Sequence, residues 1–107
     1  MKVTKVDGIF KASRITGPKH NYLGLVFTKN QPDEIKLIPR TLNGEPAIID
    51  PQRMVAAVVL GIEEASKGNP QEFYAHSIEY VVSDTPDYSA YAILAKFIAE
   101  SAVSEPL

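Results

Sequence analysis

The residues best suited to chemistry lie in the first half of the chain, where basic side chains and a tyrosine recur at strand spacing. Tyr22 and Lys36 each alternate with apolar residues, which places each on one face of its own strand. Cations that neutralise phosphates, beside a ring that stacks on a base, are typical of surfaces for anionic small molecules or single-stranded nucleic acid. The residues predicted to form such a basic sheet face are Arg14, Lys19, His20, Tyr22, Lys36 and Arg40.

The distribution of charge favours a binding partner without naming one. Residues 1–53 carry nine Lys or Arg against five Asp or Glu, whereas residues 54–107 carry two against eight. The pI of about 5.6 argues against a dedicated nucleic-acid binder, which normally has a basic excess. The same split suits self-association, with the basic surface of one protomer against the acidic helices of another.

A catalytic role is predicted only as an alternative, through His76. This histidine alternates with Tyr74, Ile78 and Tyr80 on the side of a strand that we expect to face the core. That setting is typical of a buried, hydrogen-bonded histidine. The active alternative is a general base with Tyr74 or Tyr80 beside it, in a pocket between sheet and helices.

Three carboxylates receive structural interpretations. Glu79, on the opposite face from His76, is interpreted as a solvated charge. Asp84 and Asp87 flank the start of a helix, where the macrodipole favours negative charge. None of the three is therefore assigned to catalysis.

The sequence assigns no catalytic residue, metal ligand or cofactor. It has no cysteine, and neither of its two histidines has a partner at metal-ligand spacing. Nucleophile-elbow and phosphate-loop fingerprints are absent from the sequence. Its longest apolar run, Met54 to Ile62, is about half of what a membrane span requires. We expect a cytoplasmic protein with no membrane partner.

Alternation of apolar and polar residues predicts β-strands over much of the chain, and these strands carry the candidate site residues. Asp7-Gly8 predicts a bulge or a tight turn, and residues 13–19 predict a loop. The turn at residues 30–33 predicts a hairpin between the strands on either side of it, and the basic sheet face depends on that hairpin. The predicted strands are residues 2–12, 20–28, 34–39 and 72–83.

Two helices complete the pattern. Asp50-Pro51 and Thr85-Pro86 each combine an N-cap residue with a proline. The first helix should stop at Gly68-Asn69-Pro70, and the second should reach about Ala102, with a frayed tail from about residue 103. The first helix is apolar around nearly its whole circumference, which indicates either the centre of a helix layer or a homodimer interface.

The order β-β-β-α-β-α predicts a single α+β domain over residues 1–107, a mostly antiparallel sheet with two helices packed on one face. Our leading hypothesis is a small non-catalytic module that binds a protein partner or assembles with itself as a homodimer. The alternatives are a binder of an anionic small molecule or single-stranded nucleic acid, and a small enzyme that uses His76.

Overall fold

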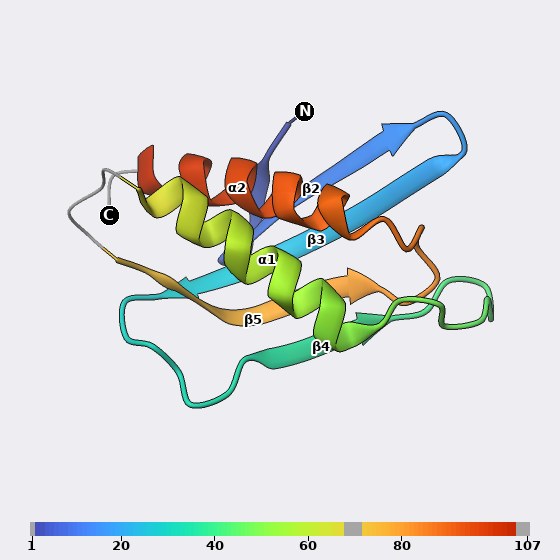
Figure 1. The fold of residues 1–107 in the computed structure, drawn as a ribbon, viewed down its shortest axis with the longest axis horizontal. Coiled ribbons are helices and arrows are strands. Elements are labelled where there is room, and N and C mark those ends of the chain that lie inside the picture. The colour runs from blue at the N-terminus through green and yellow to red at the C-terminus, as the bar shows by residue number, and fades with distance from the viewer. Residues whose placement is uncertain (1, 68–71, 105–107) are drawn as a thin grey trace.

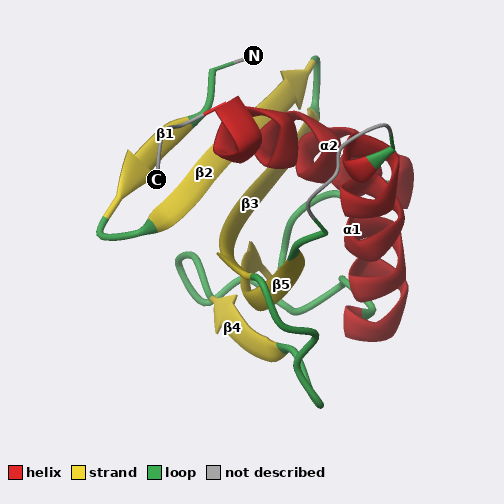
Figure 2. Ribbon diagram, turned by 90° about the vertical axis from the view of Figure 1, so that its left-hand side faces the viewer, coloured by secondary structure: helices red, strands yellow, loops and turns green. Residues whose placement is uncertain are grey.

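Five strands form one sheet, and two helices cover one of its faces (Figures 1 and 2). The computed structural model describes residues 2–67 and 72–104. The strand order is β1-β2-β3-β5-β4, and every neighbouring pair is antiparallel except β4 with β5. The predicted α+β class is therefore confirmed. The elements are β1 (Thr4–Val6), β2 (Ile9–Thr16), β3 (Lys19–Thr28), β4 (Lys36–Arg40), α1 (Pro51–Ser66), β5 (Tyr74–Val81) and α2 (Tyr88–Ser104).

Two tight turns join the first three strands. Asp7 and Gly8 have φ angles of 52° and 80°, the conformation of a type I′ hairpin turn, for which Asp-Gly is favoured. The predicted turn at these residues is confirmed. The second turn is Gly17-Pro18, where Gly17 has a φ of 61°. The loop predicted over residues 13–19 is shorter than expected, because β2 continues through Thr16 and pairs with β3.

The predicted hairpin between residues 20–28 and 34–39 is wrong, because β5 lies between these two strands. β4 pairs with β5 in parallel, and α1 is the crossover that joins them. β5 is buried on both faces: Ser77 and Glu79 are 4% and 6% exposed, and Ile78 and Tyr80 are equally covered. An edge position would have exposed the backbone groups along one side of this strand to water.

The two helix starts differ in how closely they follow the sequence signal. Asp50 caps α1, since its Oδ1 accepts the backbone N–H groups of Gln52 at 3.0 Å and Arg53 at 3.4 Å. That predicted cap is confirmed. α2 begins at Tyr88, three residues after Thr85. The predicted stop at Gly68-Asn69-Pro70 lies outside the described residues. α2 extends through Ser104, beyond the predicted end near Ala102 and into the predicted frayed tail, and residues 105–107 lie outside the described residues.

Most of the apolar surface of α1 is covered within the chain. Met54, Val58 and Ile62 are buried in the core. Gly61 packs against the backbone of Ala92 in α2. Leu60 remains 57% exposed. α1 therefore packs against α2 and the sheet, and the homodimer interface stays a prediction. Within the described residues, neither helix has the length and apolar character needed to cross a membrane.

Candidate functional site

The uncovered face of the sheet gathers side chains from all five strands. Residues directly opposite one another on paired strands share a face, so the pairing registers define it. Its central row runs from β1 to β4 without interruption. The uncovered face is defined by that central row and by the rows on either side of it. The central row consists of Thr4, Lys11, Gly24, Glu79 and Ile38. The rows on either side contain Ser13, Tyr22, Val81, Arg40, Val6, Ile9, Val26, Ser77, Lys36, Ile15 and His20.

Glu79 lies at the centre of this face, and its interpretation as a solvated charge is wrong. The residue is only 6% exposed. The Tyr22 hydroxyl donates to its Oε1, while Nε and Nη2 of Arg40 donate to its Oε2 at 2.9 and 2.8 Å. The Arg40 side chain is itself 58% exposed. The buried carboxylate of Glu79 is thus neutralised by the guanidinium of Arg40, which remains partly exposed to solvent.

The protonation states in this cluster are set by its hydrogen bonds. Burial alone would raise the pKa of Glu79, but the hydrogen bonds from Tyr22 and Arg40 outweigh it and hold the pKa below its ordinary value. Burial, reinforced by the hydrogen bond to Glu79, raises the pKa of Tyr22. At neutral pH the carboxylate is therefore ionised and the phenol protonated, which suits a stable charge pair better than proton transfer.

Gly24 makes room for this arrangement. A Cβ at this position would lie 3.0 Å from the Tyr22 hydroxyl, 3.1 Å from Oε1 of Glu79 and 3.2 Å from Cγ2 of Ile9. Glycine inside a strand marks a place where neighbouring groups approach closely. The bare backbone at Gly24 lets the hydroxyl of Tyr22 and the carboxylate of Glu79 meet above it.

The structure brings together four of the six residues predicted for the basic sheet face, namely His20, Tyr22, Lys36 and Arg40. They share a face although the hairpin is absent, because β5 adds one strand between them without changing which positions point outward. Arg14 pairs with Asn21 on the helix-covered side. Lys19 lies on that side as well, with its Nζ 3.9 Å from Oδ2 of Asp87.

The opposite charges of the two halves of the chain meet inside the fold. The ion pairs of Arg40 with Glu79 and of Lys19 with Asp87, and the hydrogen bond between His20 and Asp84, each join a residue of the first half to one of the second. These three pairs form because β5 and the segment after it lie alongside β3 and β4. Part of the charge asymmetry that favoured an external partner is thus used intramolecularly.

Asp84 does not cap α2, so that interpretation of the residue is wrong. It is 1% exposed, and its Oδ2 accepts the backbone N–H of Tyr22 at 2.7 Å. Its Oδ1 lies 3.0 Å from Nδ1 of His20. Burial raises the pKa of Asp84, although these two hydrogen bonds oppose the shift. The carboxylate of Asp84 thus accepts the backbone N–H of Tyr22 in place of a backbone carbonyl, at the point where β3 and β5 cease to pair.

Asp87, by contrast, behaves as the sequence indicated for a carboxylate at a helix start. Its Oδ1 accepts the hydroxyl of Ser89, in the first turn of α2, at 2.6 Å. This hydrogen bond, with lesser help from Lys19, lowers the pKa of Asp87. The residue therefore stabilises the beginning of α2.

The predicted core-facing position of His76 is wrong, because its side chain is exposed. The register of the β3–β5 ladder shifts between Val26 and Phe27, and this irregularity turns Ala75 toward the core in place of His76. His76 therefore does not enter the pocket between sheet and helices that the enzyme alternative required. A bulge shifts strand alternation by one residue, and the sequence carries no Gly or Pro here to signal it.

Lys11, Gly24 and Glu79 belong to the uncovered face but were not among the residues predicted for the basic sheet face. A glycine within a strand could have indicated a close approach of neighbouring groups. Glu79, between Ile78 and Tyr80, follows ordinary strand alternation, which gave no indication of its burial. Nothing in the sequence indicated that Lys11 belongs to the site, because a single lysine within a strand is common.

No protein-family model matches the chain, and no curated protein is significantly similar to it in sequence. We therefore infer function from the geometry of the uncovered face. Exposed cations around an already neutralised carboxylate can bind a second set of carboxylates or phosphates.

Replacing Glu79 with Gln is expected to lower the free energy of unfolding by about 1–2 kcal/mol at pH 7. Gln keeps an acceptor for Tyr22 but removes the charge that holds Arg40. Because the folded-state pKa of Glu79 lies below its ordinary value, its contribution is present above the unfolded pKa and is lost as the pH falls through the folded one.

The difference between wild type and Glu79→Gln should therefore shrink as the pH falls from the ordinary glutamate pKa through the lower folded-state pKa, as measured by urea unfolding. Glu100→Gln, on the exposed surface of α2, is the control and should differ little from wild type. A difference for Glu79→Gln that stays constant over this range would contradict the assignment.

Proposed function

We propose that this protein is a non-catalytic binding module that holds an acidic protein partner on the uncovered face of its sheet. The observation that carries the proposal is the composition of that face. Lys11, Lys36 and Arg40 contribute cations, and the carboxylate among them, Glu79, is buried and neutralised. The face therefore presents positive charge to whatever approaches it.

Exposed aliphatic side chains favour a protein over a nucleic acid. Ile15 is 74% exposed and Val6 is 50% exposed, and both belong to the uncovered face. Single-stranded nucleic acid is held by cations together with aromatic rings that stack on its bases, and Tyr22 is the only Phe, Tyr or Trp among the residues that define the uncovered face. Aliphatic contacts beside cations suit a partner with both apolar and acidic residues.

The predicted homodimer remains a proposal, supported by the exposed Leu60 on α1. An isologous dimer through the uncovered face is disfavoured, since it would bring Lys11, Lys36 and Arg40 of two copies together. Light scattering of the purified protein tests the oligomeric state directly.

Charge reversal at Lys36 tests the proposed face. The probe is a short fluorescein-labelled peptide of Glu and Leu, and oligothymidine of the same length represents the nucleic-acid alternative. Lys36→Glu should weaken peptide binding by about fivefold or more at low salt, because an attraction becomes a repulsion. Arg14→Glu makes the same change in charge on the helix-covered side and should alter the affinity less than about twofold.

Equal losses in Lys36→Glu and Arg14→Glu would overturn the proposed face, because the effect would then follow net charge alone. Stronger binding of oligothymidine than of the peptide would replace the protein partner with a nucleic acid. Fluorescence anisotropy at low and at physiological salt distinguishes these results.

A further inference from the structure

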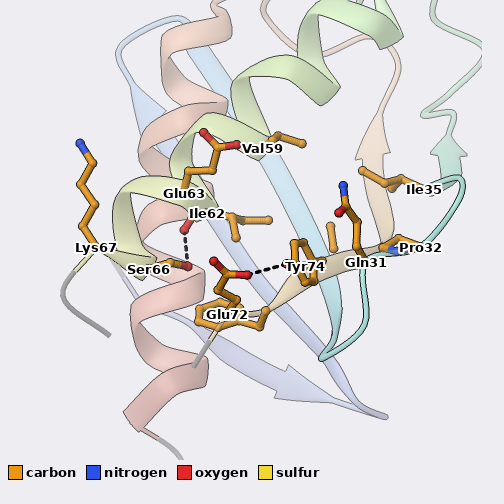
Figure 3. Close-up of a pocket in the computed structure, with 12 residues that line it drawn as sticks. Gln31, Pro32, Ile35, Val59, Ile62, Glu63, Ser66, Lys67, Glu72 and Tyr74 are labelled. Carbon is orange, nitrogen blue, oxygen red and sulfur yellow. Dashed lines mark hydrogen bonds between the residues drawn. The ribbon is translucent and has the colours of Figure 1, made fainter. Parts of the chain in front are cut away.

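A pocket of about 510 Å³ opens on the opposite side of the sheet from the uncovered face, between the second half of α1, the chain before β4 and the start of β5 (Figure 3). Its volume lies within the range of small-molecule sites. The apolar part of its lining consists of Pro32, Ile35, Val59, Ile62, Phe73 and Ala75. Such a lining can take an apolar ring or chain out of water.

The polar part of the lining includes two carboxylates, one lysine, Gln31, Ser66 and Tyr74. Glu63 and Glu72 both line the pocket. The Tyr74 hydroxyl donates to Oε2 of Glu72 at 2.8 Å, and this hydrogen bond raises the pKa of Tyr74. Lys67 also lines the pocket, but its Nζ lies 2.6 Å from Oε2 of Glu64 and its side chain extends away from Tyr74 (Figure 3). Since Glu64 neutralises Lys67, Glu63 and Glu72 leave the pocket negatively charged.

We propose that this pocket binds an organic amine with an apolar body. The ammonium group would lie between the carboxylates of Glu63 and Glu72, and the body would contact Val59, Ile62 and Phe73. The rings of Phe73 and Tyr74 add a favourable surface for a cation. An anionic ligand with the same body would meet two like charges and be rejected. This binding is independent of the sheet face on which the proposed partner lies.

Titration with tryptamine and indole-3-acetate tests the proposal, because the two share a ring and differ in charge. Followed by two-dimensional NMR of the labelled protein, tryptamine should bind with a dissociation constant on the order of 1 mM or lower. The largest shifts should fall on Val59, Ile62 and Ala75. Indole-3-acetate should bind at least about tenfold more weakly.

Two sets of variants locate the site and its charge. Glu63→Gln and Glu72→Gln should each weaken tryptamine binding by about three- to tenfold. Glu45→Gln makes the same change in the loop before α1, at the other end of that helix, and should leave the affinity unchanged. Val59→Phe should weaken binding, whatever the charge of the ligand, because the larger side chain occupies space that the apolar body would take.

Several results would overturn the assignment. They are equal affinity for the two indoles, no saturable shift with tryptamine, an effect of Glu45→Gln as large as that of Glu72→Gln, and full binding by Val59→Phe. Because the carboxylate variants change exposed residues, their spectra should keep the native dispersion. They therefore give a result even where Val59→Phe fails to fold.

Discussion

Replacing Gly61 with Val is expected to destabilise the protein by about 3 kcal/mol or more. A Cβ at position 61 would lie 2.3 Å from the backbone oxygen of Ala92 and 2.9 Å from Cβ of Ala95. Backbone cannot move aside as a flexible side chain can, so α1 and α2 would have to separate. Separation of the helices would open the core that they share with the sheet.

Gly61→Ala tests the same close contact between α1 and α2 by adding a single methyl group. In an isolated helix, alanine is more favourable than glycine by about 1 kcal/mol. Here we expect a loss of about 2 kcal/mol and a decrease of about 10 °C in Tm, because the added Cβ meets backbone. Leu60→Ala, at the adjacent exposed position, is the control and should cost less than about 1 kcal/mol. Thermal unfolding of the three variants checks this, and a stabilised Gly61→Ala would refute the close helix contact.

Removal of the Asp84 carboxylate should cost about 2–3 kcal/mol in Asp84→Ala. The backbone N–H of Tyr22 would then lose its acceptor at the end of β3, and His20 would lose its partner. Asp84→Asn keeps the shape and one acceptor oxygen for Tyr22, so it should cost less than about 1 kcal/mol. Urea unfolding of both variants at pH 7 separates the lost hydrogen bond from the lost charge.

The pH dependence of the Asp84 variants has the opposite sign from that of Glu79. Burial raises the folded-state pKa of Asp84, so the folded protein binds the proton more tightly than the unfolded chain does. The wild type should therefore lose stability relative to Asp84→Asn as the pH rises from the ordinary aspartate pKa through the folded one. A relative gain in that range would show that the hydrogen bonds from Tyr22 and His20 outweigh burial.

Local signals were sufficient for the turns, for one helix cap and for the class of fold. Asp7-Gly8 specifies its turn because few residue pairs adopt two successive positive φ angles. Asp50-Pro51 specifies the start of α1, since the cap involves only residues two and three positions away. The succession of strand and helix patterns was enough to predict an α+β domain with both helices on one face.

The candidate site was predictable only in part. Tyr22, Lys36 and Arg40 were correctly placed on one face, because no bulge interrupts the alternation of β3 and β4 at these residues. The role of Glu79 was not predictable, because it depends on which strand lies beside β5. The predicted hairpin made β3 and β4 neighbours, which left Glu79 with no residue that could pair with its carboxylate. The burial of Glu79 therefore could not be predicted.

The sequence by itself determined the approximate positions of most strands and of both helices, and which side chains share a face within β3 and within β4. The tertiary structure alone decided the position of β5 between β3 and β4, the bulge that exposes His76, and the pairing of the basic half of the chain with the acidic half. The physical reason is the range of the interactions. Turns and caps are settled by hydrogen bonds among neighbouring residues. Strand order instead depends on burial and charge pairing between residues such as Arg40 and Glu79, which are far apart in the chain.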